Sequence, residues 1–178
     1  SIAKYALENG FNIINDITGG GKSNKMFEVA ADNECKIIIM HMKGLPANMQ
    51  DDPYYDNVMN DLNLFFEDKI KTAHKIGVKD SQIILDPGLG FGKRIIDNYT
   101  IINNIECIKK NGYPVLIGIS RKSFLSINND DPKDRMPASL GGNVLALING
   151  ADIIRTHDVN EHYKMFKILT RILNSKKI

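Results

Sequence analysis

The chain has 178 residues, 43% of them hydrophobic and 25% charged, which is the composition of a globular protein with one hydrophobic core. Its 23 basic and 21 acidic residues leave a formal net charge of +2, so the bulk charge favours neither nucleic acid nor an anionic membrane as a partner. Two cysteines, Cys35 and Cys107, are too few for a disulfide framework or a zinc cluster, and no apolar run approaches the ~20 residues of a membrane helix.

Short runs rich in Ile and Val alternate along the chain with longer segments of helical periodicity. The apolar runs are continuous, as in strands buried on both faces, and predict strands at residues 12–17, 36–42, 82–85, 114–119 and 152–156. The periodic segments predict helices at residues 24–33, 55–76, 98–111, 138–149 and 161–174. Residues 1–9 have the pattern of a helix end that leads into the first strand.

Strict alternation of strand and helix implies parallel strands with right-handed crossovers, in either a doubly wound sheet or an α/β barrel. Polar residues follow every predicted strand. In a barrel all the strand-to-helix loops face one site, whereas a doubly wound sheet needs such residues only at its switch point. We therefore predict a TIM (β/α)8 barrel, here partial, with about five parallel strands and flanking helices in a single domain over residues 1–178. Such a barrel usually takes about 250 residues, so three strands are expected to precede this chain in a longer gene product.

Residues 84–93 form the most informative stretch, because an apolar run ends on Asp86 and becomes a glycine-rich loop. Pro87 ends the strand ladder, and glycines let the backbone approach a ligand closely. A loop built only for turning would not need the acid. The stretch predicts a binding site at the end of this strand.

Two glycine-rich stretches mimic nucleotide-binding motifs. Residues 19–23 resemble the end of a P-loop, but the motif requires a glycine five places before Gly21 and the chain has Asp16 there. Residues 88–93 resemble a dinucleotide fingerprint, but Lys93 occupies its sixth place, which requires Gly or Ala. Neither stretch is predicted to bind a nucleotide.

Every predicted strand end carries polar or sulfur-containing side chains. Each has an ordinary structural explanation: a turn cap, a strand-end ion pair, a solvated basic pair, a buried histidine or a methionine filling the core. Five strand ends with such residues indicate one shared site instead, because barrel geometry brings them to one mouth. The set comprises Asn15, Asp16, Met40, His41, Met42, Asp86, Ser120, Arg121, Lys122, Ser123, Arg155, His157 and Asp158.

The chemistry of this set indicates group transfer. Asn15 and Asp86 offer an amide and a carboxylate, which suit the donor and acceptor edge of a planar heterocycle such as an aminopyrimidinone. Basic side chains in the same set suit a phosphate-like anion, with arginine shaped for bidentate contacts. These are Arg121, Lys122, Arg155 and His157.

Several motifs occur in the order and spacing of dihydropteroate synthase, so the chain resembles that family over essentially its whole length. They lie at residues 13–16, 40–44 with 49–50, 86–93, 120–123 and 154–159. The family is a TIM barrel and a transferase. It joins 6-hydroxymethyl-7,8-dihydropterin pyrophosphate to p-aminobenzoate in folate synthesis, releases pyrophosphate, and is a target of sulfonamides. The resemblance implies the same activity here.

Carried over by position, the resemblance implies three groups of ligand-binding residues and no covalent nucleophile, with Lys122 and Asp86 essential. The pterin would be bound by Asn15, Met40, Asp86, Gly118 and Lys122. The pyrophosphate would be bound by Arg121, Arg155 and His157. The p-aminobenzoate would be bound by Phe91 and by Ser123 with the amino end of the following helix.

The resemblance also implies Mg²⁺ as cofactor, small-molecule substrates as partners, a homodimer for the full-length protein, and a cytoplasmic location. No nucleic acid or membrane is expected as a partner. The family's first strands supply an asparagine for magnesium, an aspartate for the pterin and two closing loops, none of which has a counterpart in this sequence, so this part alone is expected to lack full activity.

Two alternatives stay open. The first is a methyltetrahydrofolate-type pterin-binding methyltransferase, which should lack the Ser-Arg-Lys-Ser segment at 120–123 and the Arg155/His157 pair, because it expels no pyrophosphate. The second is a non-catalytic remnant that uses the half-barrel as a scaffold.

Overall fold

A computed structural model describes residues 2–21 and 23–175 of the chain. Its strands are β1 (Ile13–Asp16), β2 (Lys36–Met40), β3 (Ile83–Asp86), β4 (Leu116–Ile117) and β5 (Ile153–Ile154). Its α-helices are α1 (Ile2–Glu8), α2 (Lys25–Asp32), α3 (Val58–Ile76), α4 (Ile95–Asn103), α5 (Ile105–Lys109), α6 (Met136–Ile148) and α7 (Val159–Leu173), with 3₁₀ turns η1 (Asp80–Gln82) and η2 (Ser123–Leu125). The predicted domain limits at Ser1 and Ile178, and Lys22 of the first glycine-rich stretch, lie outside the described residues.

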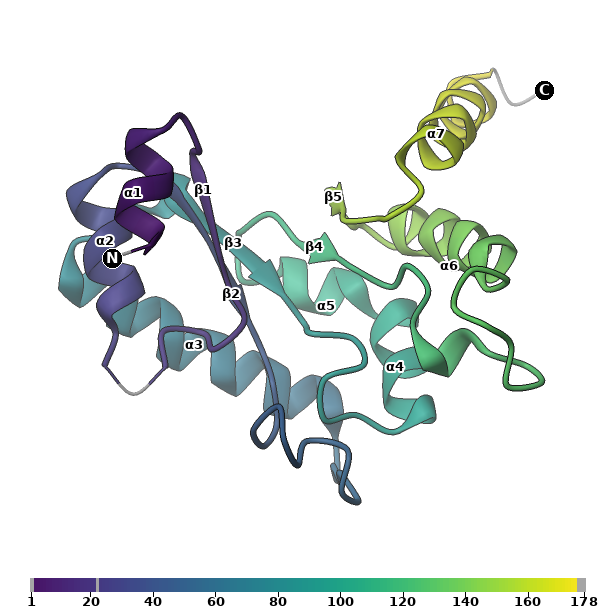
Figure 1. Ribbon diagram of the computed structural model, residues 1–178, viewed down its shortest axis with the longest axis horizontal. Coiled ribbons are helices and arrows are strands. Elements are labelled where there is room, and N and C mark those ends of the chain that lie inside the picture. The colour runs from purple at the N-terminus through teal and green to yellow at the C-terminus, as the bar shows by residue number, and fades with distance from the viewer. Residues whose placement is uncertain (1, 22, 176–178) are drawn as a thin grey trace.

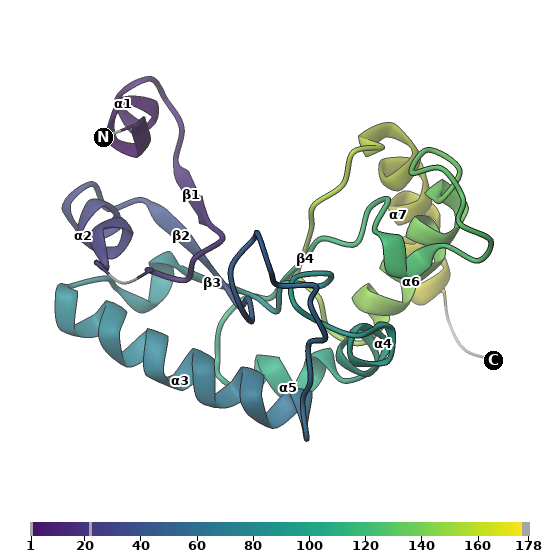
Figure 2. The same ribbon diagram turned by 60° about the horizontal axis from the view of Figure 1, so that its bottom comes forward.

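All strands that pair along the described residues are parallel. One sheet has the order β1-β2-β3, and β4 pairs with β5. A parallel bridge between Leu85 and Val115 and a 2.9 Å bond from the Leu85 amide to the Pro114 carbonyl connect the two sheets. The result is a curved α/β layer with β1 and β5 at its edges, so the predicted α/β class is confirmed although the barrel is not closed (Figures 1 and 2).

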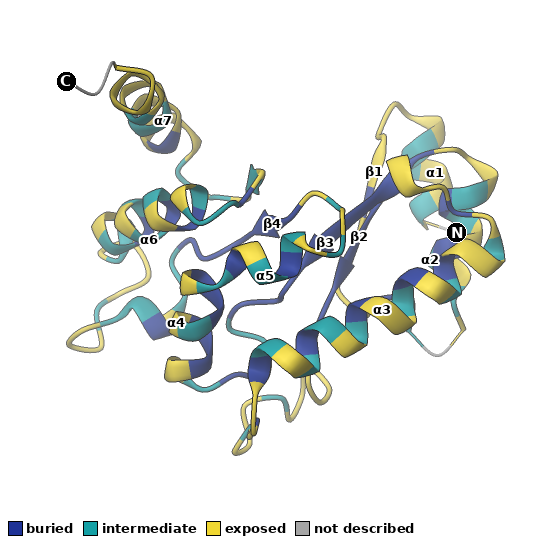
Figure 3. Cartoon of the chain, turned by 180° about the vertical axis from the view of Figure 1, so that it is seen from behind, coloured by how far each residue is buried: buried dark blue, intermediate teal, exposed yellow. Residues whose placement is uncertain are grey.

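The core has two parts because the sheet buries both of its faces. A large cluster packs the sheet against the helices and includes Phe27, Leu62 and Phe66, each with no exposed surface. A small cluster on the opposite, concave face consists of Ile38, Ile84 and Leu116, with Ile153 packed against it. Figure 3 shows buried residues along β2 and β3 and on the sheet-facing sides of the helices.

Several predicted boundaries were wrong for local reasons. The predicted helix 98–111 is two helices separated at Asn104, whose side-chain amide donates to the Thr100 carbonyl at 2.8 Å. The helix α4 begins earlier than predicted, since the Asp97 carboxylate accepts from the Arg94 amide at 2.9 Å and caps that end. The helix α3 begins later, at Val58, because Asn57 is its N-cap. The strands β4 and β5 are only two residues long each.

Candidate functional site

The concave face of the sheet carries the predicted ligand-binding residues at one end. Side chains on one face of a strand recur every second residue, so the residues two places after the small core cluster lie on the same face as the cluster. These four residues are Met40, Asp86, Gly118 and Arg155. Asn15 also faces this side, because it is paired in register with Ile38, and its side chain is exposed. The structure therefore brings five strand-end residues of the predicted site to one mouth.

Asp86 is the buried acid at the centre of this mouth, with only 4% of its surface exposed. The Gly88 amide donates to its Oδ1 at 2.7 Å. Burial raises the pKa of this carboxyl to about 6, against the opposing effects of the Gly88 hydrogen bond and of the positive charges on Arg155, Lys93 and Lys122. An ionised carboxylate buried here is stabilised by a partner that donates hydrogen bonds to it.

Lys122 and Phe91 lie together beside Asp86. The Lys122 ammonium lies 4.1 Å above the centroid of the Phe91 ring, a cation–π contact. Its aliphatic stem crosses Gly90, where an added Cβ would come within 3.2 Å of the Lys122 Cδ. Burial, with a contribution from the neighbouring Arg155, lowers the pKa of Lys122. The ammonium is thereby held over an aromatic face and close to the acid.

The Arg155 guanidinium lies against the backbone of Gly118, just after β4. A Cβ at Gly118 would come within 3.1 Å of the Arg155 Nη2, so the absence of a side chain at 118 is what lets the guanidinium rest there. The charge of this guanidinium acts on both Asp86 and Lys122. Gly118 thus leaves the space that the Arg155 guanidinium occupies.

Ser120 positions His157 across the β4 and β5 ends. Its hydroxyl oxygen is a partner of the His157 Nδ1 at 3.0 Å and accepts from the His157 amide at 3.2 Å. The Thr156 hydroxyl donates to the same oxygen at 3.3 Å. Ser120 is 5% exposed, so the exposed His157 ring is held by a buried neighbour.

Arg121 is already engaged by a carboxylate. Its guanidinium binds Asp158 through two bonds, one of them from Nε to Oδ2 at 3.1 Å, and this ion pair raises the pKa of Arg121 and lowers that of Asp158. The backbone of Arg121 has φ 60°, a left-handed conformation that is uncommon for a non-glycine residue. Its amide donates to the Ser139 hydroxyl at 3.0 Å, which anchors this turn to α6.

Two of the strand-end residues have structural roles. The Asp16 carboxylate caps a turn, accepting from the Thr18 amide at 2.9 Å and the Gly20 amide at 2.7 Å. His41 is 6% exposed and packs edge-on against Phe65 with ring centroids 4.9 Å apart. Burial, helped by the charge of Lys93, lowers the pKa of His41 to about 3. The ordinary explanations hold for both.

Ser123 lines a cleft on the far side of the glycine-rich loop. The cleft has a volume of about 290 Å³ and is also lined by Gln50, Gly90 and Phe124. Ser123 itself opens the three-residue turn η2, and the following helix α6 begins at Met136, close to its predicted start at residue 138. A second cavity, of about 520 Å³, lies at the amino ends of the strands beside Ile13 and belongs to the open edge of the layer.

Sequence reasoning missed four residues that shape the glycine-rich loop. Gln50 and Lys93 lie in the motifs at 49–50 and 86–93, but neither was assigned a role. Nothing in the sequence pointed to Tyr55 or Asn98. The four residues are Gln50, Tyr55, Lys93 and Asn98.

Among residues 2–21 and 23–175, no group of three or more His, Cys, Asp or Glu side chains could hold a metal ion. Within the same residues, no helix combines the length and the apolar character needed to cross a membrane.

Fold and site together define a class: an open α/β barrel layer whose strand ends present a buried acid beside three cationic side chains, suited to an anionic ligand with a hydrogen-bonding heterocycle. A family model described as "Pterin binding enzyme" matches residues 1–157, and the chain belongs to that family. Its relatives there are dihydropteroate synthases.

The dihydropteroate synthase of Synechocystis is 36% identical over 169 residues, which cover 94% of this chain and 58% of that relative. A crystal structure of the Yersinia pestis enzyme with a sulfonamide drug complex has a TM-score of 0.93 and 35% identity, covering 98% of this chain and 64% of that one. The Thermus thermophilus enzyme in complex with 6HMPPP has a TM-score of 0.90 and 31% identity, covering 97% of this chain and 69% of that one. The chain thus spans about three-fifths of the curated relative, and these solved structures confirm the TIM-barrel type predicted for its fold.

Proposed function

We propose that this chain is a single pterin-binding domain that supplies most of the active site of a dihydropteroate synthase in folate synthesis. The observation that carries the proposal is the buried carboxylate of Asp86, which lies on the concave face among Lys122 and Arg155. An ionised acid is costly in such a place without a ligand that donates hydrogen bonds to it. A pterin has an amino group and a ring N–H on one edge that meet this requirement.

The pterin site is proposed to consist of residues that share the concave face. Asp86 accepts hydrogen bonds from the pterin's amino group and ring nitrogen, and the exposed Asn15 amide completes the polar edge. Lys122 reaches the ring system from its position above Phe91. Met40 and Gly118 line the walls, since both point to the same face as Asp86.

The pyrophosphate is proposed to bind at the β5 end, to Arg155, His157 and Arg121. Ser120 holds the His157 ring in place, and Asp158 fixes the Arg121 guanidinium. Cations fixed before the reaction stabilise the charge that develops on a departing diphosphate at no reorganisation cost. In the reaction, the bond from the pterin methylene carbon to the diphosphate oxygen breaks, the amine nitrogen of p-aminobenzoate bonds to that carbon, and the amine loses a proton.

The p-aminobenzoate is proposed to pack against the Phe91 ring with its carboxylate toward Ser123. Phe91 is half-buried and its ring already carries the Lys122 ammonium on one face. The cleft beside Ser123 lies on the other side of Gly90. The 120–123 segment and the Arg155/His157 pair favour this function over the methyltransferase alternative.

Three further expectations remain proposals. Magnesium, when bound, would offset negative charge on the pyrophosphate. Exposed apolar side chains on α6 and α7, among them Leu145, Ile148 and Tyr163, support a homodimer. The free thiols of Cys35 and Cys107 are compatible with a reducing cytoplasm.

The proposal is tested by titrating the chain with 6-hydroxymethyl-7,8-dihydropterin pyrophosphate by calorimetry, in magnesium buffer with and without p-aminobenzoate, while assaying dihydropteroate. We expect binding by the wild type, and a loss of roughly tenfold to a hundredfold in affinity for Lys122→Ala, the range for removing a charged hydrogen-bond partner. Lys110→Ala, on the surface, is the matched control. No binding by a folded wild type, or equal binding by the Lys122 variant, would refute the proposal.

A further inference from the structure

The glycine-rich loop at residues 88–92 is held from within by a buried lysine. Lys93 follows the loop and is 4% exposed. Its ammonium donates to the Gly88 carbonyl at 3.0 Å and to the Phe91 carbonyl at 3.2 Å, and it contacts the His41 Nδ1 at 3.0 Å. The ammonium therefore joins both ends of the loop to the residue that follows β2.

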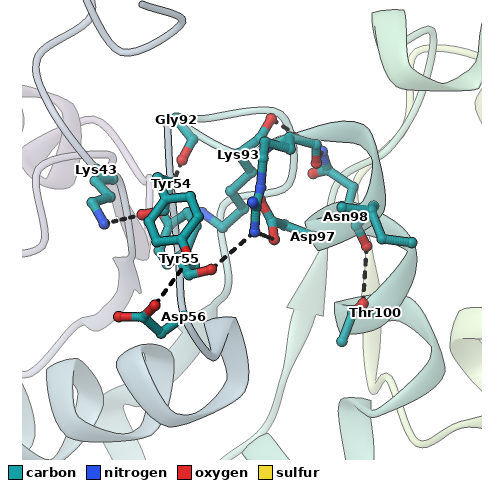
Figure 4. Close-up of polar contacts among 11 residues, drawn as sticks. Lys43, Tyr54, Tyr55, Asp56, Gly92, Lys93, Asp97, Asn98 and Thr100 are labelled. Atoms are coloured by element: carbon teal, nitrogen blue, oxygen red, sulfur yellow. Dashed lines mark hydrogen bonds and ion pairs between the residues drawn. The ribbon is translucent and has the colours of Figure 1, made fainter. Parts of the chain in front are cut away.

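Neighbouring side chains bind three further polar backbone atoms of the loop. The Tyr55 hydroxyl donates to the Gly92 carbonyl at 2.8 Å, and the Gln50 amide donates to the Gly90 carbonyl at 2.7 Å. The Gly90 amide donates to the Asn98 Oδ1 at 2.7 Å. Figure 4 shows Tyr55 and Gly92 on one side of Lys93 and Asn98 on the other. None of these three bonds reaches the Phe91 carbonyl, which among the described partners receives only the Lys93 ammonium.

We propose that Lys93 is a positioning residue for the ligand site: its ammonium fixes the Gly88 and Phe91 carbonyls against His41, and so sets the place of the Phe91 ring beneath Lys122. The effect on ligands rests on the proposed function, whereas the effect on the loop does not. Lys93 also lines the cleft beside Ser123, but its ammonium is bound to the loop carbonyls and to His41. It acts through Phe91, on which the Lys122 ammonium lies.

The chemistry of its four partners explains why an ammonium is needed: besides the Gly88 and Phe91 carbonyls and the His41 Nδ1, it donates to the His41 carbonyl at 3.4 Å. An ammonium has three N–H donors, whereas the neutral amine has two, so deprotonation leaves fewer donors for these partners. Burial lowers the pKa of His41 to about 3, and the neutral ring accepts through Nδ1 in the tautomer that carries its proton on Nε2. The charged groups that face Lys93 are Asp86, Asp97 and Lys122, and the two aspartates partly offset the burial that lowers the pKa of Lys93 to about 7.

A lysine that merely stabilised the fold would behave differently from a positioning lysine. Removing the donor leaves its acceptors unsatisfied, which destabilises the whole fold if they stay buried but only loosens the loop if the loop can open to water. Lys93→Met keeps the stem and removes the donors. A purely structural lysine would therefore show itself in global stability, and a positioning lysine in the loop and in ligand binding.

The test is amide hydrogen exchange of the full chain by NMR, with Lys75→Met, an exposed lysine on α3, as the matched control. In Lys93→Met we expect the Phe91 and Gly90 amides to exchange roughly tenfold to a hundredfold faster, the range for losing charged hydrogen bonds, with β2 amides and the thermal midpoint unchanged. In the wild type, protection of the Phe91 amide should fall as pH rises from about 7 to about 9, a range in which Asp86 stays ionised and His41 stays neutral. The pH effect should be absent in Lys93→Met.

Ligand binding provides the second measurement. If the wild type binds dihydropterin pyrophosphate, the affinity of p-aminobenzoate for the pterin-bound protein should be at least about tenfold lower in Lys93→Met than in the wild type, again the range for losing charged hydrogen bonds. The affinity for the pterin itself should change less. Two results in Lys93→Met would overturn the positioning role whether or not the wild type binds pterin. One is unchanged exchange of the Phe91 amide, and the other is a loss of protection in the β2 amides as large as that at Phe91. Failure of the wild type to bind pterin would instead count against the proposed function.

Discussion

Replacing Asp86 by Asn is predicted to stabilise the protein while abolishing pterin binding. The folded-state pKa of about 6, against an ordinary 3.8, corresponds to about 3 kcal/mol of unfavourable free energy for the ionised carboxylate. Asn keeps an oxygen for the Gly88 amide, but its NH₂ group has no acceptor in the ligand-free site, which costs about 1 kcal/mol. We therefore expect a net gain of about 2 kcal/mol at neutral pH.

The sign of the pH dependence makes this prediction specific. Because the folded-state pKa is raised, the folded protein holds its proton to higher pH, and wild-type stability falls as pH rises from about 4 to about 6. The gain from Asp86→Asn should therefore be absent near pH 4 and complete above pH 6. Urea denaturation followed by circular dichroism at several pH values measures it, and calorimetry measures pterin binding.

Asp16→Asn, at the end of β1, is the matched control. The Asp16 carboxylate accepts from Gly20 and Thr18 on both oxygens, so an NH₂ group there would face a donor and the variant should be destabilised at neutral pH. The reasoning about Asp86 is refuted if Asp86→Asn is less stable than wild type at neutral pH, or if it still binds the pterin with unchanged affinity.

Two other substitutions test the loop and the leaving-group site. Gly88→Ala should destabilise the fold by roughly 3 kcal/mol or more in urea denaturation, because Gly88 has φ 65° and an added Cβ would lie 1.9 Å from the His41 carbonyl oxygen. The control Gly10→Ala, at φ 93° with nothing within 4 Å of the added Cβ, should cost only about 1 kcal/mol. Equal losses of stability in the two variants would contradict the predicted clash with His41. Ser120→Ala should weaken calorimetric binding of dihydropterin pyrophosphate about tenfold, by releasing His157, but not that of the pterin without pyrophosphate; equal losses for both ligands would remove His157 from the pyrophosphate site.

The sequence allowed the strands and the concave-face residues to be predicted because both depend on local patterns. Continuous apolar runs mark β1 to β3, and a two-residue period fixes the face on which Asp86 lies. The break at Asn104 was hidden, since Ile101, Ile105 and Ile108 keep helical spacing through it and are all fully buried.

Long-range pairings could not be predicted in the same way. Arg121 binds Asp158, 37 positions away, and Lys93 reaches His41, 52 positions away. Each pair forms only after a crossover through a helix, α3 or α6, has brought two neighbouring strand ends together. A single sequence gives the residue types for such contacts but no partner.

The small apolar cluster on the concave face has a consequence for how this chain can change length. Ile84 and Asp86 share a face only because one residue separates them, so inserting or deleting one residue between them would turn the acid toward the helices. Length changes inside the strands should therefore be lost from functional sequences. In the exposed loop at residues 127–134, between η2 and α6, no side chain has to point to a particular face of the sheet. Insertions should be tolerated there.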